Sequence, residues 1–129
     1  MFKFIRQITG YTFLILALAN ISIVQAQDKV TINQEIKFRS GRISAAHRGR
    51  IARGTSHIYR VRARAGQQMA VVLKTGNRTS FTISARSAGI LEGADGVRQT
   101  LVELPETGIY EIQIGTDATA NYTLEVTIK

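Results

Sequence analysis

Apolar and polar residues alternate in short runs over most of the chain. In segment 57–66, the apolar Tyr59 and Val61 alternate with Arg60 and Arg62. Successive side chains of a strand point to opposite faces, so a period of two predicts strands with one buried face. Similar alternation or a short apolar run marks further segments: 35–38, 43–51, 68–74, 80–85, 100–104, 109–115 and 122–128.

These segments predict an all-β fold. About eight short strands separated by Gly, Asn, Asp and Ser, with no 3.6-residue apolar stripe, are typical of an antiparallel β-sandwich or jelly roll. We expect the domain to span 35–129. Residues 27–34 are expected to be a lead-in segment or an edge strand. Residues 86–100 are expected to form a long loop, with a short strand near 90–91.

The string "LPETG" at 104–108 matches the signal that sortases cleave in Gram-positive surface proteins. A sorting signal continues into an apolar membrane segment and a basic tail. Here the following residues are "IYEIQIGTDATANYTLEVTIK", which predict two amphipathic strands. Pro105 and Gly108 suit a turn, because proline fixes φ and glycine accepts positive φ. We therefore interpret 104–108 as a turn between strands.

The first 26 residues have the pattern of a secretory signal peptide. Lys3 and Arg6 are followed by the apolar run 12–24, and cleavage is expected between Ala26 and Gln27. An uncleaved anchor is the alternative, but the run is short for a bilayer. We expect a periplasmic or secreted protein with no stable membrane insertion after cleavage. It has no cysteine, and therefore no disulfide or thiolate zinc site.

The charge is distributed unevenly. Residues 27–78 contain 12 basic and 2 acidic residues, whereas residues 79–129 contain 3 basic and 7 acidic residues. This asymmetry predicts a positive surface and an anionic partner. For an exported protein, we expect an anionic glycan, another envelope polymer or an acidic protein, and no nucleic acid.

Enzymatic chemistry leaves no clear pattern in the sequence. His47 and His57 lack a metal-ligand spacing, and there is no cysteine nucleophile or G-x-S-x-G motif. We predict no catalytic residues, no metal site and no cofactor, and interpret both histidines chiefly as structural.

Two groups of arginines are the main candidates for binding. Arg60, Arg62 and Arg64 are expected in a row on one strand face, where guanidinium groups suit carboxylate and phosphate. Alternatively, this face is solvated and paired across strands with Glu103, Glu111 and Glu125. The second group is Arg48, Arg50 and Arg53.

Four segments carry a resemblance to a known family: "IKFRSGRISAAHRGRI" (36–51), "IYRVRARAGQQMAVVL" (58–73), "LPETGIYEIQIG" (104–115) and "NYTLEVTIK" (121–129). They resemble bacterial pre-peptidase C-terminal domains, most of all the periplasmic inhibitors of g-type (goose-type) lysozyme. The resemblance implies an exported β-sandwich of a usually non-enzymatic kind, which as an inhibitor would insert end loops into the cleft of a lysozyme or other peptidoglycan hydrolase. We expect the protein to be a monomer.

The resemblance assigns binding to loops 52–57 and 115–121. This chain has Gly54 where the inhibitor pattern has an aromatic residue, and Asp117 but no arginine in the second loop. The alternative function is the binding of a glycan or envelope polyanion by the arginine-rich face. The candidate binding residues for both hypotheses are Arg48, Arg50, Arg53, His57, Arg60, Arg62, Arg64 and Asp117.

Overall fold

The computed structural model describes residues 29–76 and 78–129, which form nine β-strands. The strands are β1 (Lys29–Glu35), β2 (Ser44–Ile51), β3 (Thr55–Ala63), β4 (Gln68–Lys74), β5 (Thr79–Ala85), β6 (Gly89–Ile90), β7 (Gln99–Glu103), β8 (Gly108–Thr116) and β9 (Ala120–Ile128). The described residues include no helix.

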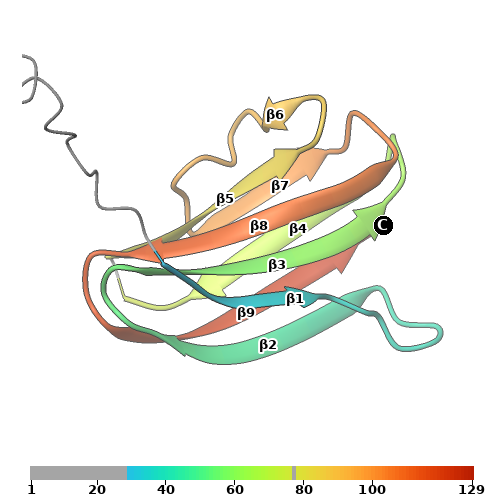
Figure 1. Cartoon of the computed structure of the whole chain (residues 1–129). Helices are drawn as coiled ribbons and strands as arrows, with labels where there is room; N and C mark the ends of the chain where they lie inside the picture. Colours follow the sequence, from blue (N-terminus) through green and yellow to red (C-terminus); the bar gives the residue numbers. More distant parts are fainter. Residues whose placement is uncertain (1–28, 77) are drawn as a thin grey trace, which may run out of the picture.

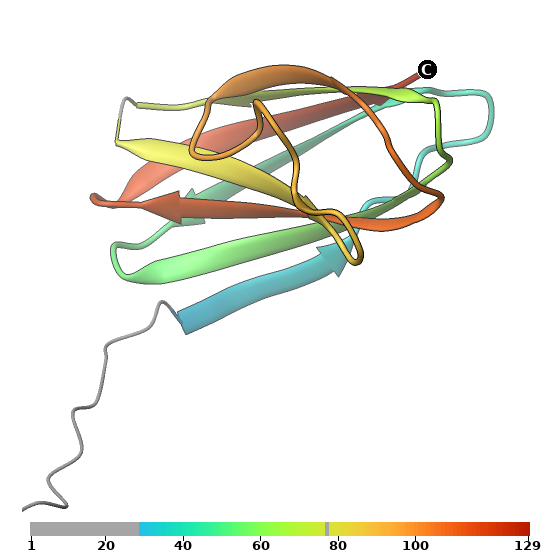
Figure 2. The same cartoon turned by 90° about the horizontal axis from the view of Figure 1, so that it is seen from above.

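The strands form two sheets that pack as layers (Figures 1 and 2). One sheet has the order β1-β3-β8-β5-β6, and the other has the order β2-β9-β4-β7. Every pairing is antiparallel except that of β1 with β3. The predicted all-β sandwich is confirmed, and the structure has nine strands instead of about eight.

The first strand differs from the prediction. Segment 35–38 is not a strand, because β1 ends at Glu35. Residues Lys29–Glu35 form the edge strand that the sequence left as one alternative. Ile36 is 3% exposed and Phe38 packs partly against the core. These apolar side chains anchor the chain where it leaves one sheet for the other, so their spacing was not a strand signal.

Alternation places the core where the sequence predicted it. In β3, Tyr59, Val61 and Ala63 are buried between the sheets, whereas Arg62 is exposed. The other strands contribute alternate residues in the same way. The largest fully buried side chains include Tyr59, Tyr110, Phe81, Ile51, Met69 and Ile83.

The segment 104–108 is a connection, as predicted, and it crosses from β7 in one sheet to β8 in the other. Leu104 is buried, and its carbonyl oxygen accepts a hydrogen bond from the Gly66 amide at 2.8 Å. The hydroxyl group of Tyr110 donates to the carbonyl oxygen of Glu106, which ties the turn to β8. The pentapeptide is thus folded against the domain.

Candidate functional site

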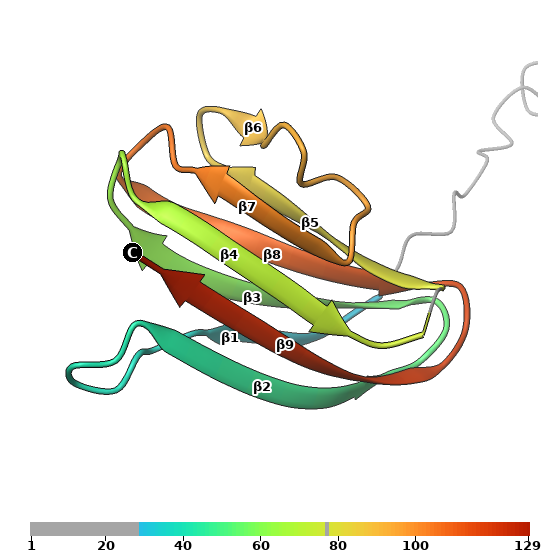
Figure 3. The same ribbon diagram turned by 180° about the vertical axis from the view of Figure 1, so that it is seen from behind.

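Three connections meet at one end of the sandwich, which we call the loop end (Figures 1 and 3). They are residues 52–54 between β2 and β3, the described residues 75–76 and 78 between β4 and β5, and residues 117–119 between β8 and β9. The Arg53 amide donates to Oγ1 of Thr119 at 3.2 Å. The Asp117 amide donates to the carbonyl oxygen of Arg78 at 3.1 Å. The loops expected from the resemblance are therefore adjacent and form one surface.

Local geometry explains the shape of the β2–β3 turn. The Thr55 amide donates to the Ala52 carbonyl at 3.1 Å, and the Thr55 hydroxyl donates to the same oxygen at 2.6 Å. Gly54 has a φ of 77°, a conformation that is strained for other residues. Arg53 thus lies at the exposed tip of a tight turn. An aromatic side chain at position 54 would require a different backbone.

The β8–β9 turn is held by Thr116. Its hydroxyl donates to the carbonyl oxygen of Ala118 and accepts a hydrogen bond from the Ala118 amide at 3.1 Å. Asp117 is consequently exposed at the tip. The exposed charged residues at or next to the loop end include Arg50, Arg53, Arg78 and Asp117. The surface is positive, with one carboxylate in it.

A buried polar cluster lies beneath this end. Nδ1 of His57 and the hydroxyl group of Tyr122 are 2.7 Å apart, and the hydroxyl groups of Tyr122 and Tyr59 are 2.6 Å apart. The two tyrosine rings meet edge to face, with centroids 6.5 Å apart. The cluster therefore connects the start of β3 with the start of β9.

Burial sets the protonation of the cluster. It lowers the pKa of His57 below the ordinary value of 6.5, so the imidazole is neutral at pH 7. Burial, and then the hydrogen bond with Tyr59, raises the pKa of Tyr122 far above its ordinary value. His57 and Tyr122 are thus both uncharged, and the cluster is a structural element.

Gly49 leaves the space that the Tyr122 ring occupies. A Cβ atom at position 49 would lie 2.5 Å from the hydroxyl oxygen of Tyr122 and 2.6 Å from Cζ. The two residues are direct cross-strand partners between β2 and β9. Sequence reasoning missed this pair, because only the register of the two strands brings the residues together.

The expectation that His57 takes part in binding is corrected. His57 is 2% exposed and forms its hydrogen bond inside the core. His47 lies on β2, with its ring centroid 5.4 Å from that of Tyr59. Nδ1 of His47 is 3.2 Å from Nε2 of Gln34 on β1. The interpretation of both histidines as structural residues agrees with these positions.

The arginine row on β3 is shorter than predicted. β3 ends at Ala63, and the Arg64 amide donates to Oε1 of Gln67 at 2.8 Å in the turn that follows. Arg64 therefore lies one residue beyond the strand, and it is exposed like Arg62. The prediction that all three arginines lie on one strand is wrong for Arg64.

On the face of the five-stranded sheet, acidic residues lie beside Arg60, whereas Arg62 is paired in register with Ile109. Arg60 is paired in register with Glu35 on β1 and with Glu111 on β8. Its guanidinium group also donates to Oδ1 of Asn33. Of the predicted cross-strand acids, Glu111 is correctly placed, whereas Glu103 and Glu125 belong to the other sheet. This face has mixed charge and is not a continuous positive track.

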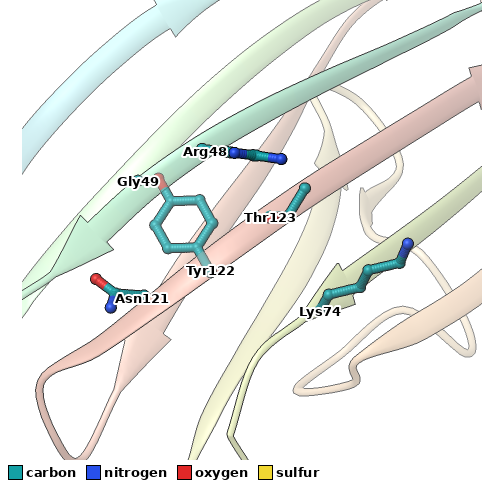
Figure 4. A pocket seen from close by; sticks show the side chains of 6 residues that line it. All are labelled: Arg48, Gly49, Lys74, Asn121, Tyr122 and Thr123. Carbon is teal, nitrogen blue, oxygen red and sulfur yellow. The ribbon is translucent and has the colours of Figure 1, made fainter.

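The four-stranded sheet has a different outer face. Arg48 and Arg50 lie on its exposed side, as does Lys74, which the sequence analysis did not single out. Figure 4 shows Arg48 and Lys74 on either side of Thr123. Only the strand order β2-β9-β4 makes these residues neighbours.

Two further observations concern the part of the chain that the structure describes. Within it, no group of three or more His, Cys, Asp or Glu side chains could hold a metal ion. None of its segments is a helix of the length and apolar character that would cross a membrane.

The fold defined above is that of a small antiparallel β-sandwich with clustered end loops. It is similar to the crystal structure of PliG from Aeromonas hydrophila, a periplasmic inhibitor of g-type lysozyme. The TM-score is 0.68 at 27% sequence identity, and the match covers 79% of this chain and 99% of that chain.

Two further solved structures share the fold. One is a mutant of PliG from Escherichia coli, with a TM-score of 0.62 and 18% identity over 78% of this chain and 99% of that chain. The other is PliG from Salmonella Typhimurium, with a TM-score of 0.59 and 22% identity over 78% and 98%. No sequence profile of a protein family matches the chain, and no curated protein sequence matches it.

Proposed function

We propose that this protein is an exported, non-enzymatic inhibitor of g-type lysozyme that acts through its loop end. The similarity to Aeromonas hydrophila PliG carries the proposal, because a structural match over 99% of that chain and 79% of this one is joined to 27% sequence identity. The contact between loops 52–54 and 117–119 supports it, since it presents both loops as one surface.

The chemistry of the loop end suits the cleft of a glycosidase. Enzymes of this class generally use a pair of Asp or Glu side chains beside the scissile glycosidic bond. Arg53, at the tip of the β2–β3 turn, is the natural partner for such a carboxylate. The loop would thus occupy the cleft in place of the polysaccharide. Asp117, on the neighbouring tip, would pair with a basic residue of the enzyme.

The remaining parts of the proposal follow from the same comparison and from the sequence. The PliG structures are described as periplasmic, which agrees with the signal peptide expected over residues 1–26. We further propose that the domain is monomeric, needs no cofactor and is related to pre-peptidase C-terminal domains. The last point is supported by the residue pattern of segments 36–51 and 104–115.

The test is a lysis assay with purified protein on bacterial cell walls. Goose-type, chicken-type and invertebrate-type lysozymes are titrated separately with the protein. The expected result is stoichiometric inhibition of the goose-type enzyme alone. The absence of inhibition of this enzyme would contradict the proposal, as would equal inhibition of all three.

The loop end itself is tested by the charge reversal Arg53→Glu. Replacing the arginine of a buried Arg–carboxylate pair by glutamate costs about 2–5 kcal/mol of binding free energy. Inhibition should therefore weaken by a factor of about 30 or more. The matched control is Arg86→Glu, an equal change of charge that lies beyond the far end of β5. Equal inhibition by the two variants would show that the loop end is not the contact surface.

A further inference from the structure

The outer face of the four-stranded sheet has a hollow with a volume of about 520 Å³ (Figure 4). It lies over β9, between β2 and β4. The lining residues are Arg48, Gly49, Lys74, Asn121, Tyr122 and Thr123.

Strand register sets the arrangement of its charged groups. Arg48 and Lys74 are both direct cross-strand partners of Thr123, one from each side. Cross-strand partners lie on the same face of a sheet, and neighbouring strands are about 4.8 Å apart. The two cationic stems are therefore about 10 Å apart. Their long side chains can converge on one anionic group above the hydroxyl of Thr123.

The cationic groups of Arg48 and Lys74 still have hydrogen-bond donors with which they can bind a ligand. Nζ of Lys74 is 2.9 Å from Oε1 of Glu125, but the two side chains are 64% and 39% exposed. Such a surface pair is weak, and an ammonium group has three donors. Arg48 has no ion pair within the described part of the chain. Arg50, opposite Asn121, adds a third cation next to the hollow.

The floor of the hollow indicates the kind of ligand. It consists of short polar side chains: Asn121, with an amide that both donates and accepts, and the hydroxyl of Thr123. Tyr122 contributes no apolar anchor, because it is 3% exposed. Protein partners are usually held by aromatic or aliphatic anchors in pockets. A ligand that carries hydroxyl groups next to an anionic group suits these short polar side chains better than a protein partner does.

We propose that this hollow binds an acidic saccharide, in which a phosphate or carboxylate group contacts Arg48 and Lys74 and the sugar hydroxyls contact Asn121 and Thr123. The site adjoins the loop end but lies on the outer face of the four-stranded sheet, whereas the proposed lysozyme contact is made by the loop tips at Arg53 and Asp117. It also differs from the outer face of the other sheet, where Arg60 has Glu35 and Glu111 as its register partners on the two neighbouring strands.

The experiment is an NMR titration of the ¹⁵N-labelled protein with four probes: glucose 6-phosphate, glucuronate, glucose and inorganic phosphate. We expect shifts centred on residues 48, 74, 121 and 123. At least one acidic sugar should bind about tenfold more tightly than glucose or inorganic phosphate, equivalent to about 1.4 kcal/mol. Tighter binding of glucose 6-phosphate would identify the anionic group of the ligand as a phosphate, and tighter binding of glucuronate would identify it as a carboxylate.

Variants locate the site. Arg48→Gln and Thr123→Val should each weaken the binding of the acidic sugar several-fold, whereas the control Arg62→Gln, on the other sheet, should leave it unchanged. These side chains are not in the core, so the melting temperatures of the variants should stay close to that of the unmodified protein. A large decrease in melting temperature would reveal a variant that does not fold. Binding should also weaken as salt increases, because the pairs are exposed.

Several outcomes would overturn the proposal. Shifts centred on Arg60 and Arg62 would place the ligand on the other face. Inorganic phosphate binding as tightly as the acidic sugars would leave only a simple anion site. Tighter binding of an acidic peptide, lost in Arg48→Gln, would assign the hollow to a protein partner instead.

Discussion

On the β2 and β3 side of the core, His57, Tyr59 and Tyr122 are joined by hydrogen bonds of 2.7 and 2.6 Å. On the β4 and β5 side, Leu73 and Phe81 are buried without any polar side-chain atom. Apolar packing is not directional and tolerates substitutions that conserve volume. A buried polar cluster, in contrast, depends on a partner for each donor and acceptor. The polar side therefore constrains how the loop end is held.

The largest effect is expected when one carbon atom is added to the polar side. Gly49→Ala should lower the free energy of unfolding by about 2–3 kcal/mol, because the new Cβ displaces the Tyr122 ring. The matched change on the apolar side is Ile83→Val, which removes one carbon and should cost about 0.5–1.5 kcal/mol. Urea denaturation measures both. A smaller loss for Gly49→Ala than for Ile83→Val would remove the contrast between the two sides.

A somewhat smaller effect is expected from the removal of one oxygen atom. Tyr122→Phe leaves both His57 Nδ1 and the Tyr59 hydroxyl without their partner, which should cost about 1–3 kcal/mol. Tyr59→Phe removes only one of these two hydrogen bonds and should cost less. Thermal or urea unfolding of the two variants gives the comparison. If Tyr59→Phe were the more harmful variant, Tyr122 would not be the centre of the cluster.

The smallest effect is a dependence of stability on pH. The pKa of His57 is lower in the folded protein than its ordinary value of 6.5, so the unfolded chain binds more protons below that pH. Stability from this source is complete above pH 6.5 and decreases as the pH falls through 6.5 toward the folded pKa. Urea unfolding between pH 5 and 8 measures it.

The contribution of His57 can be isolated with variants. His57→Gln should remove this part of the pH dependence, whereas His47→Gln should retain it. An unchanged pH profile in His57→Gln would show that the histidine is not held neutral by burial.

Much of the fold could be predicted from alternation alone. The pattern of segment 57–66 correctly assigned Tyr59 and Val61 to the core and Arg62 to the surface, because a strand with one buried face has a period of two. The strand Gln68–Lys74 was predicted with its observed bounds. The loops at 52–57 and 115–121 were identified by resemblance, and the structure shows that they are in contact.

What could not be predicted depends on pairing between distant strands. His57 and Tyr122 are 65 positions apart, and no local pattern signals their hydrogen bond. Arg48 and Lys74 become neighbours only because β9, from the end of the chain, pairs between their strands. Arg64 was predicted to lie on β3 because the sequence does not show where a strand ends and a turn begins.

The close approach of the Tyr122 ring to Gly49 has a consequence for how such a sequence can change over time. A side chain at position 49 and an aromatic ring at position 122 compete for the same volume, so neither position can vary freely alone. A descendant with alanine at 49 is expected to have first exchanged Tyr122 for a smaller residue. The two positions should therefore substitute as a pair across divergent lineages, although they are 73 positions apart in the chain.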